Sequence, residues 1–202
     1  DVHKDMDKSQ ARIYDDLMVR HWNYWDEGQY SHIFVADIEG GSVKNDKDIL
    51  GADAAWDAPL APYFDVAEIA WSNDGKRLAY TCKPLTGVEY AISTDSDIFI
   101  YNTEDGSTLN INKIKTAAGM RIMEFVGYDR YPVWSPDDSK VAFCSMATPS
   151  YESDKDRLWV YDIEKGEMKY LTPEFDHSAQ NVIWKDNSTI YFLSAIHGTQ
   201  QV

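Results

Sequence analysis

Short apolar runs separated by polar turns recur along the chain. Trp71, Trp134 and Trp184 each close an apolar run that is followed by a polar turn and a second apolar run. The runs are rich in the aromatic and β-branched residues that favour strands, and the turns hold Asn, Asp, Gly and Ser. Each unit therefore predicts a hairpin of two antiparallel strands. The three units read VAEIAWSNDGKRLAYTC from Val66, RYPVWSPDDSKVAFCS from Arg130 and AQNVIWKDNSTIYFLS from Ala179.

A second hairpin pattern follows the first one along the chain. It consists of a strand, an acidic turn with glycine and another strand, and it occupies residues 31–41, 96–111 and 156–172. Together the two patterns make a unit of four antiparallel strands, with turns after the first and the third. Such units, repeated at about 40–50 residues, are typical of β-propeller blades. The wider spacing between the first two tryptophans indicates insertions near residues 83–94 and 117–128.

We therefore expect an all-β fold, an incomplete β-propeller over residues 1–202. Residues 66–116 and 130–172 predict complete blades, whereas 31–60 and 179–202 each predict half a blade. Closed propellers need about 4–8 blades. Either the chain is part of a longer protein, which we favour, or its open sheet edges pair with another copy in a homo-oligomer.

A short helical insertion is predicted over residues 11–28, before the first strand. Tyr14, Met18, Trp22 and Trp25 are spaced i, i+4, i+8 and i+11, which places them on one face of an α-helix. Ser9 suits the N-cap of this helix and Gly28 suits its C-cap.

The stretch MVRHWNYW at residues 18–25 is the densest aromatic patch of the chain. We interpret it as packing between the helix and the blades. The alternative is a role for Arg20 or His21 that faces a substrate, although the sequence shows no nucleophile or orienting partner for this histidine.

The charge of the chain excludes some classes of partner. It holds 34 Asp and Glu against 19 Lys and Arg, a net charge of −15, and no window concentrates basic residues. Nucleic acid and anionic membrane surfaces are therefore not expected as partners. No apolar run approaches the ~20 residues that span a bilayer, and the first residues do not resemble a signal peptide.

Neither the cysteines nor the histidines indicate a metal or a cofactor. Cys82 and Cys144 are expected to be buried free thiols. The histidines lack metal-ligand spacing, and the acidic turns lack the residues of a calcium loop. We expect no metal site and no cofactor-binding residue. The five histidines are His3, His21, His32, His177 and His197.

Two segments resemble a known family. WSPDDSKVAF with DRLWVYDIEKGEMKYLT is similar to the propeller repeats of TolB-type proteins and the prolyl oligopeptidase family. Residues 11–41, ARIYDDLMVRHWNYWDEGQYSHIFVADIEGG, resemble a propeller segment of bacterial dipeptidyl and acylaminoacyl peptidases of that family. The resemblance implies a propeller that caps an α/β-hydrolase domain with a Ser-Asp-His triad, in a periplasmic or secreted protein.

The catalytic part of that family has no counterpart here. No G-x-S-x-G motif occurs in the 202 residues, so no catalytic residue is assigned. The resemblance also implies that propeller carboxylates anchor the free amino terminus of a peptide substrate. The sequence does not rank the four candidates for this role, which are Glu68, Glu89, Glu124 and Glu152.

The leading hypothesis is a non-catalytic propeller segment of a serine peptidase, which limits access to the active site to short peptides. Its partners are then the missing hydrolase domain and the peptide substrates. The alternative is a TolB-like propeller that serves as a protein-binding scaffold without a hydrolase domain. A third hypothesis is a propeller that binds a glycan or another ligand on exposed aromatic residues.

Overall fold

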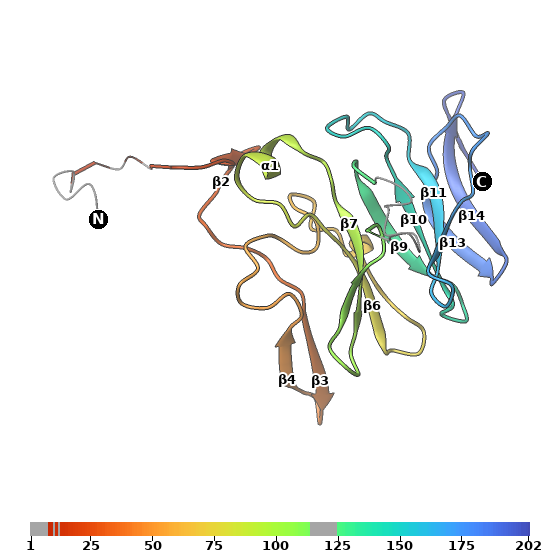
Figure 1. Cartoon of the computed structure of the whole chain (residues 1–202), viewed down its shortest axis with the longest axis horizontal. Coiled ribbons are helices and arrows are strands. Elements are labelled where there is room, and N and C mark those ends of the chain that lie inside the picture. Colours follow the sequence, from red (N-terminus) through yellow and green to blue (C-terminus); the bar gives the residue numbers. More distant parts are fainter. Residues whose placement is uncertain (1–7, 10, 12, 114–124) are drawn as a thin grey trace, which may run out of the picture.

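The computed structural model describes residues 8, 9, 11, 13–113 and 125–202, and these residues form an all-β fold (Figure 1). The one α-helix in this described part is α1 (Gly87–Ile92). A single 3-10 turn, η1 (Val66–Glu68), precedes the first large sheet.

Two four-stranded antiparallel sheets form the middle of the molecule. Their strand orders are β5-β6-β7-β8 and β9-β10-β11-β12, so each strand pairs with its neighbours in sequence. This meander is the blade topology expected from the repeat, and the predicted fold class, a partial β-propeller of four-stranded blades, is confirmed. The strands of the first blade are β5 (Ile69–Trp71), β6 (Arg77–Cys82), β7 (Asp97–Asn102) and β8 (Thr108–Asn110). Those of the second are β9 (Asp129–Trp134), β10 (Lys140–Ser145), β11 (Arg157–Asp162) and β12 (Glu167–Tyr170).

Smaller sheets flank the two blades on either side. A two-stranded sheet lies beside the β5–β8 blade, and a three-stranded sheet lies beyond the β9–β12 blade (Figure 1). The first consists of β3 (Phe34–Glu39) and β4 (Ser42–Asp48). The second consists of β13 (Gln180–Asp186), β14 (Thr189–Ile196) and β15 (Thr199–Gln201).

The second strand of each blade is buried on both faces. Every residue from Leu78 to Cys82 in β6 and from Val141 to Ser145 in β10 is at most 4% exposed. Successive side chains of a strand point to opposite faces of the sheet. A blade with two apolar faces therefore needs a packed neighbour on each side.

Three apolar clusters occupy the spaces between the sheets. Tyr80 and Cys82 pack with Ile33 and Ile49 on the side of the β3–β4 sheet. Ala79 packs on the opposite face, with Phe143 of the second blade. A third cluster joins the second blade to β13 and β14 through residues that include Ala142, Cys144 and Val182.

The repeated tryptophans connect each blade to the one before it. The indole N–H of Trp134 donates to the carbonyl of Ala70 at 2.9 Å, and that of Trp184 donates to the carbonyl of Val133 at 3.1 Å. Ala70 immediately precedes Trp71, and Val133 immediately precedes Trp134. Each indole therefore donates to the residue just before the tryptophan of the preceding blade. The guanidinium carbon of Arg77 also lies 4.7 Å from the centroid of the Trp134 ring. Trp71, the first of the series, is 48% exposed.

The turns between paired strands are linked in the same way. The carboxylate of Asp138 accepts hydrogen bonds from the backbone N–H groups of Asn73 at 2.7 Å and Asp74 at 2.9 Å, and from the Asn73 amide at 2.8 Å. Asp138 has φ +58°, and Gly75 holds the corresponding left-handed position in the first blade, with φ +71°. The acidic turns therefore serve turn geometry and blade packing.

The helix predicted over residues 11–28 is wrong for the residues that the structure describes there. That stretch contains two short antiparallel strands, β1 (Arg20–His21) and β2 (Tyr24–Trp25), joined by a two-residue turn. Trp22 takes φ +50° in this turn. The helical spacing of four aromatic and apolar residues was therefore not sufficient evidence for a helix.

A buried carboxyl group lies in the interface between the two blades. Asp129 begins β9 opposite Ser145 of β10 and is 0% exposed. Burial raises its pKa well above the usual range, and the charges of Asp97 and Asp95 raise it further, against a hydrogen bond from Ser145. The folded protein therefore binds a proton on Asp129 more tightly than the unfolded chain does.

Replacing Trp134 with Phe should lower the free energy of unfolding by about 1–2 kcal/mol, since the change removes a buried hydrogen bond and weakens the stacking of Arg77. Urea unfolding measures this difference. Trp71→Phe is the matched control, because this half-exposed indole forms no hydrogen bond within the described part of the chain, and the control should change stability by less than about 0.5 kcal/mol. Equal losses in the two variants would contradict the assigned role of the repeated tryptophan.

The contribution of Asp129 to the stability of the protein should fall as the pH rises from about 4, because Asp129 loses its proton more readily in the unfolded chain. Asp129→Asn mimics the neutral acid and should remove this decline. It should raise the free energy of unfolding at pH 7, because the amide has no proton to lose in the unfolded chain. Denaturant unfolding between pH 4 and 8 tests this, with the exposed Asp46→Asn as control. An unchanged slope in the Asp129 variant would show that this carboxyl group is ionised in the fold.

Candidate functional site

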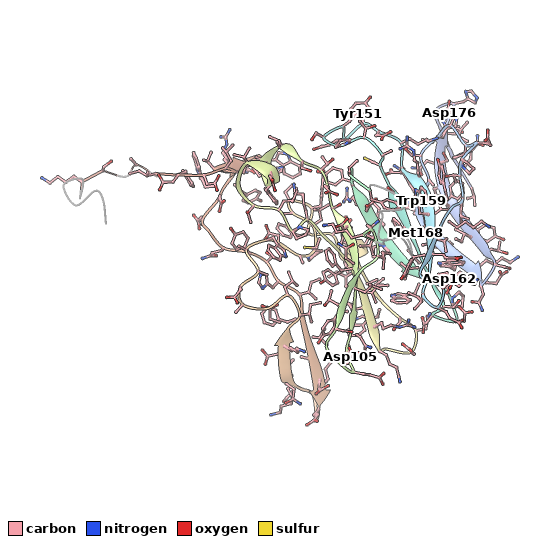
Figure 2. The ribbon with its side chains drawn as sticks, in the orientation of Figure 1. Asp105, Tyr151, Trp159, Asp162, Met168 and Asp176 are labelled. Atoms are coloured by element: carbon pink, nitrogen blue, oxygen red, sulfur yellow. The ribbon has the colours of Figure 1, made fainter. Side chains whose placement is uncertain are left out.

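The two ends of the blades differ in the length of their connections and in the side chains that they carry. One end carries short turns, and Figure 2 shows Asp105 and Asp162 there. The opposite end, which we call the loop end, carries longer connections, and Tyr151 and Asp176 lie on it. The β1–β2 hairpin and α1 lie toward the loop end (Figure 1). The aromatic, basic and acidic groups described below gather at this end.

The aromatic patch at residues 18–25 forms the β1–β2 hairpin. Arg20 pairs with Trp25, His21 pairs with Tyr24, and the ring of Tyr14 stacks on that of Trp25 with a centroid distance of 6.0 Å. Trp22, Tyr24 and Trp25 are 64%, 70% and 50% exposed. The interpretation of this patch as packing is therefore wrong, because these rings do not fill the space between sheets.

Two of these rings, those of Tyr24 and Trp25, border a cavity of about 890 Å³, a volume within the range of small-ligand sites. Its walls come from the β1–β2 hairpin, the segments around residues 26–31 and 55–64, and the start of α1. The aromatic residues that line it are His21, Tyr24, Trp25, Tyr30, Phe64 and Tyr90, and the acidic ones are Asp26, Glu27 and Asp57.

Hydrogen bonds hold two of these walls together. The Asp57 carboxylate accepts from the backbone N–H of Ser31 at 2.7 Å, and the N–H of Ala58 donates to the Ser31 carbonyl at 2.8 Å. The His32 ring contacts the carboxylate of Asp48 at 2.7 Å and the carbonyl of Ala54 at 3.0 Å. The position of Asp57 in the cavity wall is therefore well defined.

The acidic groups of the cavity act on one another. Burial raises the pKa of Asp57, the nearby charge of Asp26 raises it further, and the Ser31 N–H opposes this. Burial also raises the pKa of Tyr90 to about 12, with contributions from Asp57 and Asp26 in the same direction. These effects indicate a local excess of negative charge in the wall of the cavity.

A buried ion pair joins the two blades next to the cavity. Arg130 at the start of β9 contacts Glu68 of η1 through Nη2 at 2.6 Å and Nε at 2.7 Å. Glu68 is fully buried, and the Arg130 side chain is 12% exposed. Burial alone would lower the pKa of Arg130, but the charge of Glu68 raises it overall. The arginine is thus held as a cation by a carboxylate of the neighbouring blade.

Tyrosine rings surround this arginine. Its guanidinium carbon lies 4.2 Å from the ring centroid of Tyr63, 4.5 Å from that of Tyr131 and 5.6 Å from that of Tyr128. Tyr63 in turn makes edge contacts with Trp22 of the hairpin and with Tyr128. A continuous series of rings therefore connects the hairpin to the second blade.

A second charged group lies beside this series. Lys83, which is 7% exposed, donates to the carbonyls of Tyr90 and Ser93 at 3.0 Å each. Burial lowers the pKa of Lys83 to about 8, although the charge of Glu152 opposes this. The hydroxyl of Tyr128 lies 3.5 Å from the Glu152 carboxylate. Burial, and then the charge of Lys83, also lowers the pKa of His21, which lines the cavity, and Glu152 opposes this change.

The structure separates the four glutamates that the sequence left unranked. Glu68 is committed to Arg130 in the core. Glu89 is exposed on α1, and Glu124 lies outside the described residues. Glu152 is exposed and interacts with Tyr128, Lys83 and His21, so it is the carboxylate that the fold places among other functional groups.

The two residues proposed to face a substrate have different surroundings. His21 lines the cavity, whereas the guanidinium of Arg20 lies over the Trp25 ring at 5.8 Å. The contributions of Tyr63, Tyr128, Arg130 and Lys83 were not predicted from the sequence. Lys83 directly follows β6 and Arg130 is the second residue of β9, so charges next to apolar runs were the available signal.

Within the described residues, no group of three or more His, Cys, Asp or Glu side chains is arranged to hold a metal ion. Cys82 and Cys144 are buried free thiols, as predicted. No helix of the described part has the length and apolar character that crossing a membrane requires.

Sequence comparison relates the chain to dipeptidyl-peptidases over nearly its whole length. It is 38% identical over 195 residues to dipeptidyl-peptidase 5 of Porphyromonas gingivalis, which covers 96% of this chain and 27% of that protein. It is 39% identical over 160 residues to dipeptidyl-peptidase 5 of Porphyromonas endodontalis, covering 79% of this chain and 21% of that protein. The resemblance inferred from the two quoted segments is thereby confirmed. The chain spans about a quarter of the length of these curated relatives.

The remaining comparisons add less. No family model matches the chain. Among solved structures, TolB from Acinetobacter baumannii aligns with a TM-score of 0.44 and 14% identity, over 84% of this chain and 36% of that one. The acylaminoacyl peptidase of Pyrococcus horikoshii aligns with a TM-score of 0.42 and 20% identity, over 62% of this chain and 16% of that one.

Glu68→Gln should lower the free energy of unfolding by about 2–4 kcal/mol, because it leaves the charge of Arg130 largely buried without its partner. Thermal and urea unfolding measure the loss. Glu104→Gln is the matched control, since it breaks an ion pair with Lys76 in which both side chains are more than half exposed, and little or no loss is expected. A Glu68 variant as stable as this control would contradict the assignment of the pair as a link between the blades.

Proposed function

The chain is homologous to the dipeptidyl-peptidase 5 proteins over about a quarter of their length, and from this premise we propose that it forms a substrate-facing part of the propeller of a dipeptidyl peptidase. In this proposal the propeller caps a serine hydrolase domain that lies outside the 202 residues. It limits access to the active site to short peptides. The reaction is the removal of a dipeptide from the amino terminus of a peptide, and the protein acts in the periplasm or outside the cell.

The observation that carries this proposal is the environment of Glu152 at the loop end. An exposed carboxylate there lies beside a tyrosine hydroxyl and next to His21, which borders a cavity of ligand size. A carboxylate binds an ammonium group through charge-assisted hydrogen bonds. We assign Glu152 the role of anchoring the free amino terminus of the substrate.

The charge of Lys83 influences how strongly Glu152 binds an ammonium group. Its ammonium group is held by two backbone carbonyls and acts on Glu152 through its charge. Because burial lowers the pKa of Lys83 to about 8, this competing positive charge diminishes in mildly alkaline solution. The α-ammonium of a peptide loses its proton over the same pH range, so binding of the substrate at Glu152 should not strengthen as Lys83 is neutralised.

The alternative, a protein-binding scaffold without a hydrolase domain, makes a different prediction. A fluorophosphonate probe labels an activated serine, so one adduct on the full-length protein that contains this chain supports the peptidase. A protein that takes no label supports the scaffold.

Glu152→Gln in the full-length protein should raise the KM for dipeptidyl chromogenic substrates about tenfold, which corresponds to ~1.4 kcal/mol, and leave kcat within about twofold. The loss arises because the neutral amide no longer pairs with the substrate ammonium. Steady-state kinetics measure both constants.

The matched control is Glu164→Gln, an exposed glutamate in the turn between β11 and β12 at the opposite end of the blade, which should leave KM unchanged. An unaltered KM in the Glu152 variant would rule out this residue as the amino-terminal anchor. No hydrolysis of any dipeptidyl substrate by the wild-type protein would rule out the proposed reaction.

A further inference from the structure

The connection between β10 and β11 carries Glu152 at the loop end. It spans residues 146–156, and both Glu152 and the neighbouring Tyr151, which Figure 2 shows at this end, are exposed. A side chain on a long surface connection changes position easily unless the backbone is held. Because a loop that becomes ordered only on binding loses affinity, a binding carboxylate on such a connection needs a fixed backbone.

Asp154 closes this connection on itself. Its Oδ2 accepts hydrogen bonds from the backbone N–H groups of Ala147 at 2.9 Å and Thr148 at 2.8 Å. Its own N–H donates to the carbonyl of Tyr151 at 3.1 Å, which forms a tight turn around Glu152. One carboxylate thus joins the beginning of the connection to its end, and Glu152 lies within the closed segment.

The other oxygen of Asp154 is held by residues that lead into β11. Oδ1 accepts the N–H of Lys155 at 2.7 Å and pairs with Nη1 of Arg157 at 3.1 Å. The Asp154 side chain is only 10% exposed. Burial would raise the pKa of this carboxyl group, but hydrogen bonds from the backbone and from Arg157 lower it to about 2. Asp154 is therefore ionised at neutral pH, and both of its oxygens are occupied by donors.

Ser150 attaches the same segment to the first blade. Its N–H donates to Oγ1 of Thr94 at 2.8 Å, and its hydroxyl donates to the carbonyl of Ile92 at the end of α1. Thr94 is 7% exposed, so this acceptor belongs to the buried part of the neighbouring blade. Glu152 thus lies between two attachment points, Ser150 and Asp154.

We propose that Asp154 is a positioning residue for Glu152. Together with Ser150, its carboxylate fixes the backbone of residues 147–154 and holds the Glu152 carboxylate beside the hydroxyl of Tyr128, which lies 3.5 Å away. Asp154 does not contact the substrate, because its oxygens are already occupied. That Glu152 receives the substrate ammonium rests on the proposed function, whereas the fixing of the segment by Asp154 does not.

The first test is a double-mutant cycle in the full-length protein. Asp154→Asn replaces one acceptor oxygen with a donor, so it should raise the KM for dipeptidyl substrates about fivefold and leave kcat within about twofold. In a protein that already carries Glu152→Gln, the same change should alter KM by less than about twofold, because Asp154 acts through Glu152. Effects of the two substitutions on KM that simply multiply would overturn the inference.

Asp176→Asn is the matched control. Asp176 is exposed at the same end, in the connection between β12 and β13, and its replacement should leave KM unchanged (Figure 2). If Asp154→Asn does not fold, Ser150→Ala takes its place in the cycle, since it removes only the hydroxyl contact with Ile92. It should also raise KM, and again only when Glu152 is present. An unchanged KM in the Asp154 variant, or in the Ser150 variant that replaces it, would contradict the positioning role.

The second test does not depend on hydrolysis. Hydrogen exchange followed by mass spectrometry should be about tenfold faster in Asp154→Asn for a peptide covering residues 146–156, and unchanged for one covering β10. Unchanged exchange in the 146–156 peptide would overturn the inference whatever the kinetics show. Faster exchange, combined with an unaltered KM in Glu152→Gln, would support the fixing of the segment by Asp154 and contradict the proposed anchor.

Discussion

The burial of both faces of each blade is the constraint on which the rest of the structure depends. A sheet with one polar face is stable with a single neighbour, but β6 and β10 have no polar face between Leu78 and Cys82 or between Val141 and Ser145. Each blade must therefore be covered on both sides, and the sheets stack side by side. The indole hydrogen bonds of Trp134 and Trp184 then recur at the two interfaces on either side of the β9–β12 blade and fix how one blade lies on the next.

The stacking of the blades also determines which functional side chains lie close together. Blades of the same strand order, packed side by side, bring equivalent connections to the same end. Loops far apart in sequence thus become neighbours. Glu68 and Arg130 meet in this way at the loop end, and their ion pair lies among the tyrosines that join the hairpin to the second blade. The same arginine therefore serves both blade packing and the aromatic series.

The overall charge of the protein determines which kinds of ligand it attracts from solution. A net charge of −15 produces a negative potential that attracts cationic ligands over a distance and repels phosphate groups. The local arrangement adds what the overall charge lacks, namely two carboxylates beside aromatic rings in a space of defined volume. The overall charge influences the rate at which charged ligands associate.

The sequence by itself determined the strands, the hairpins and the blade order, because turn chemistry and the composition of neighbouring runs act over a few residues. Residues 18–25 show where this reasoning fails. The spacing of Tyr14, Met18, Trp22 and Trp25 fits a helix, yet the segment forms a hairpin whose turn residue Trp22 is left-handed. The cavity and the choice of Glu152 among four glutamates were decided only by the tertiary structure. Both depend on contacts between segments tens of residues apart, and no local pattern records which of those segments meet when the blades pack.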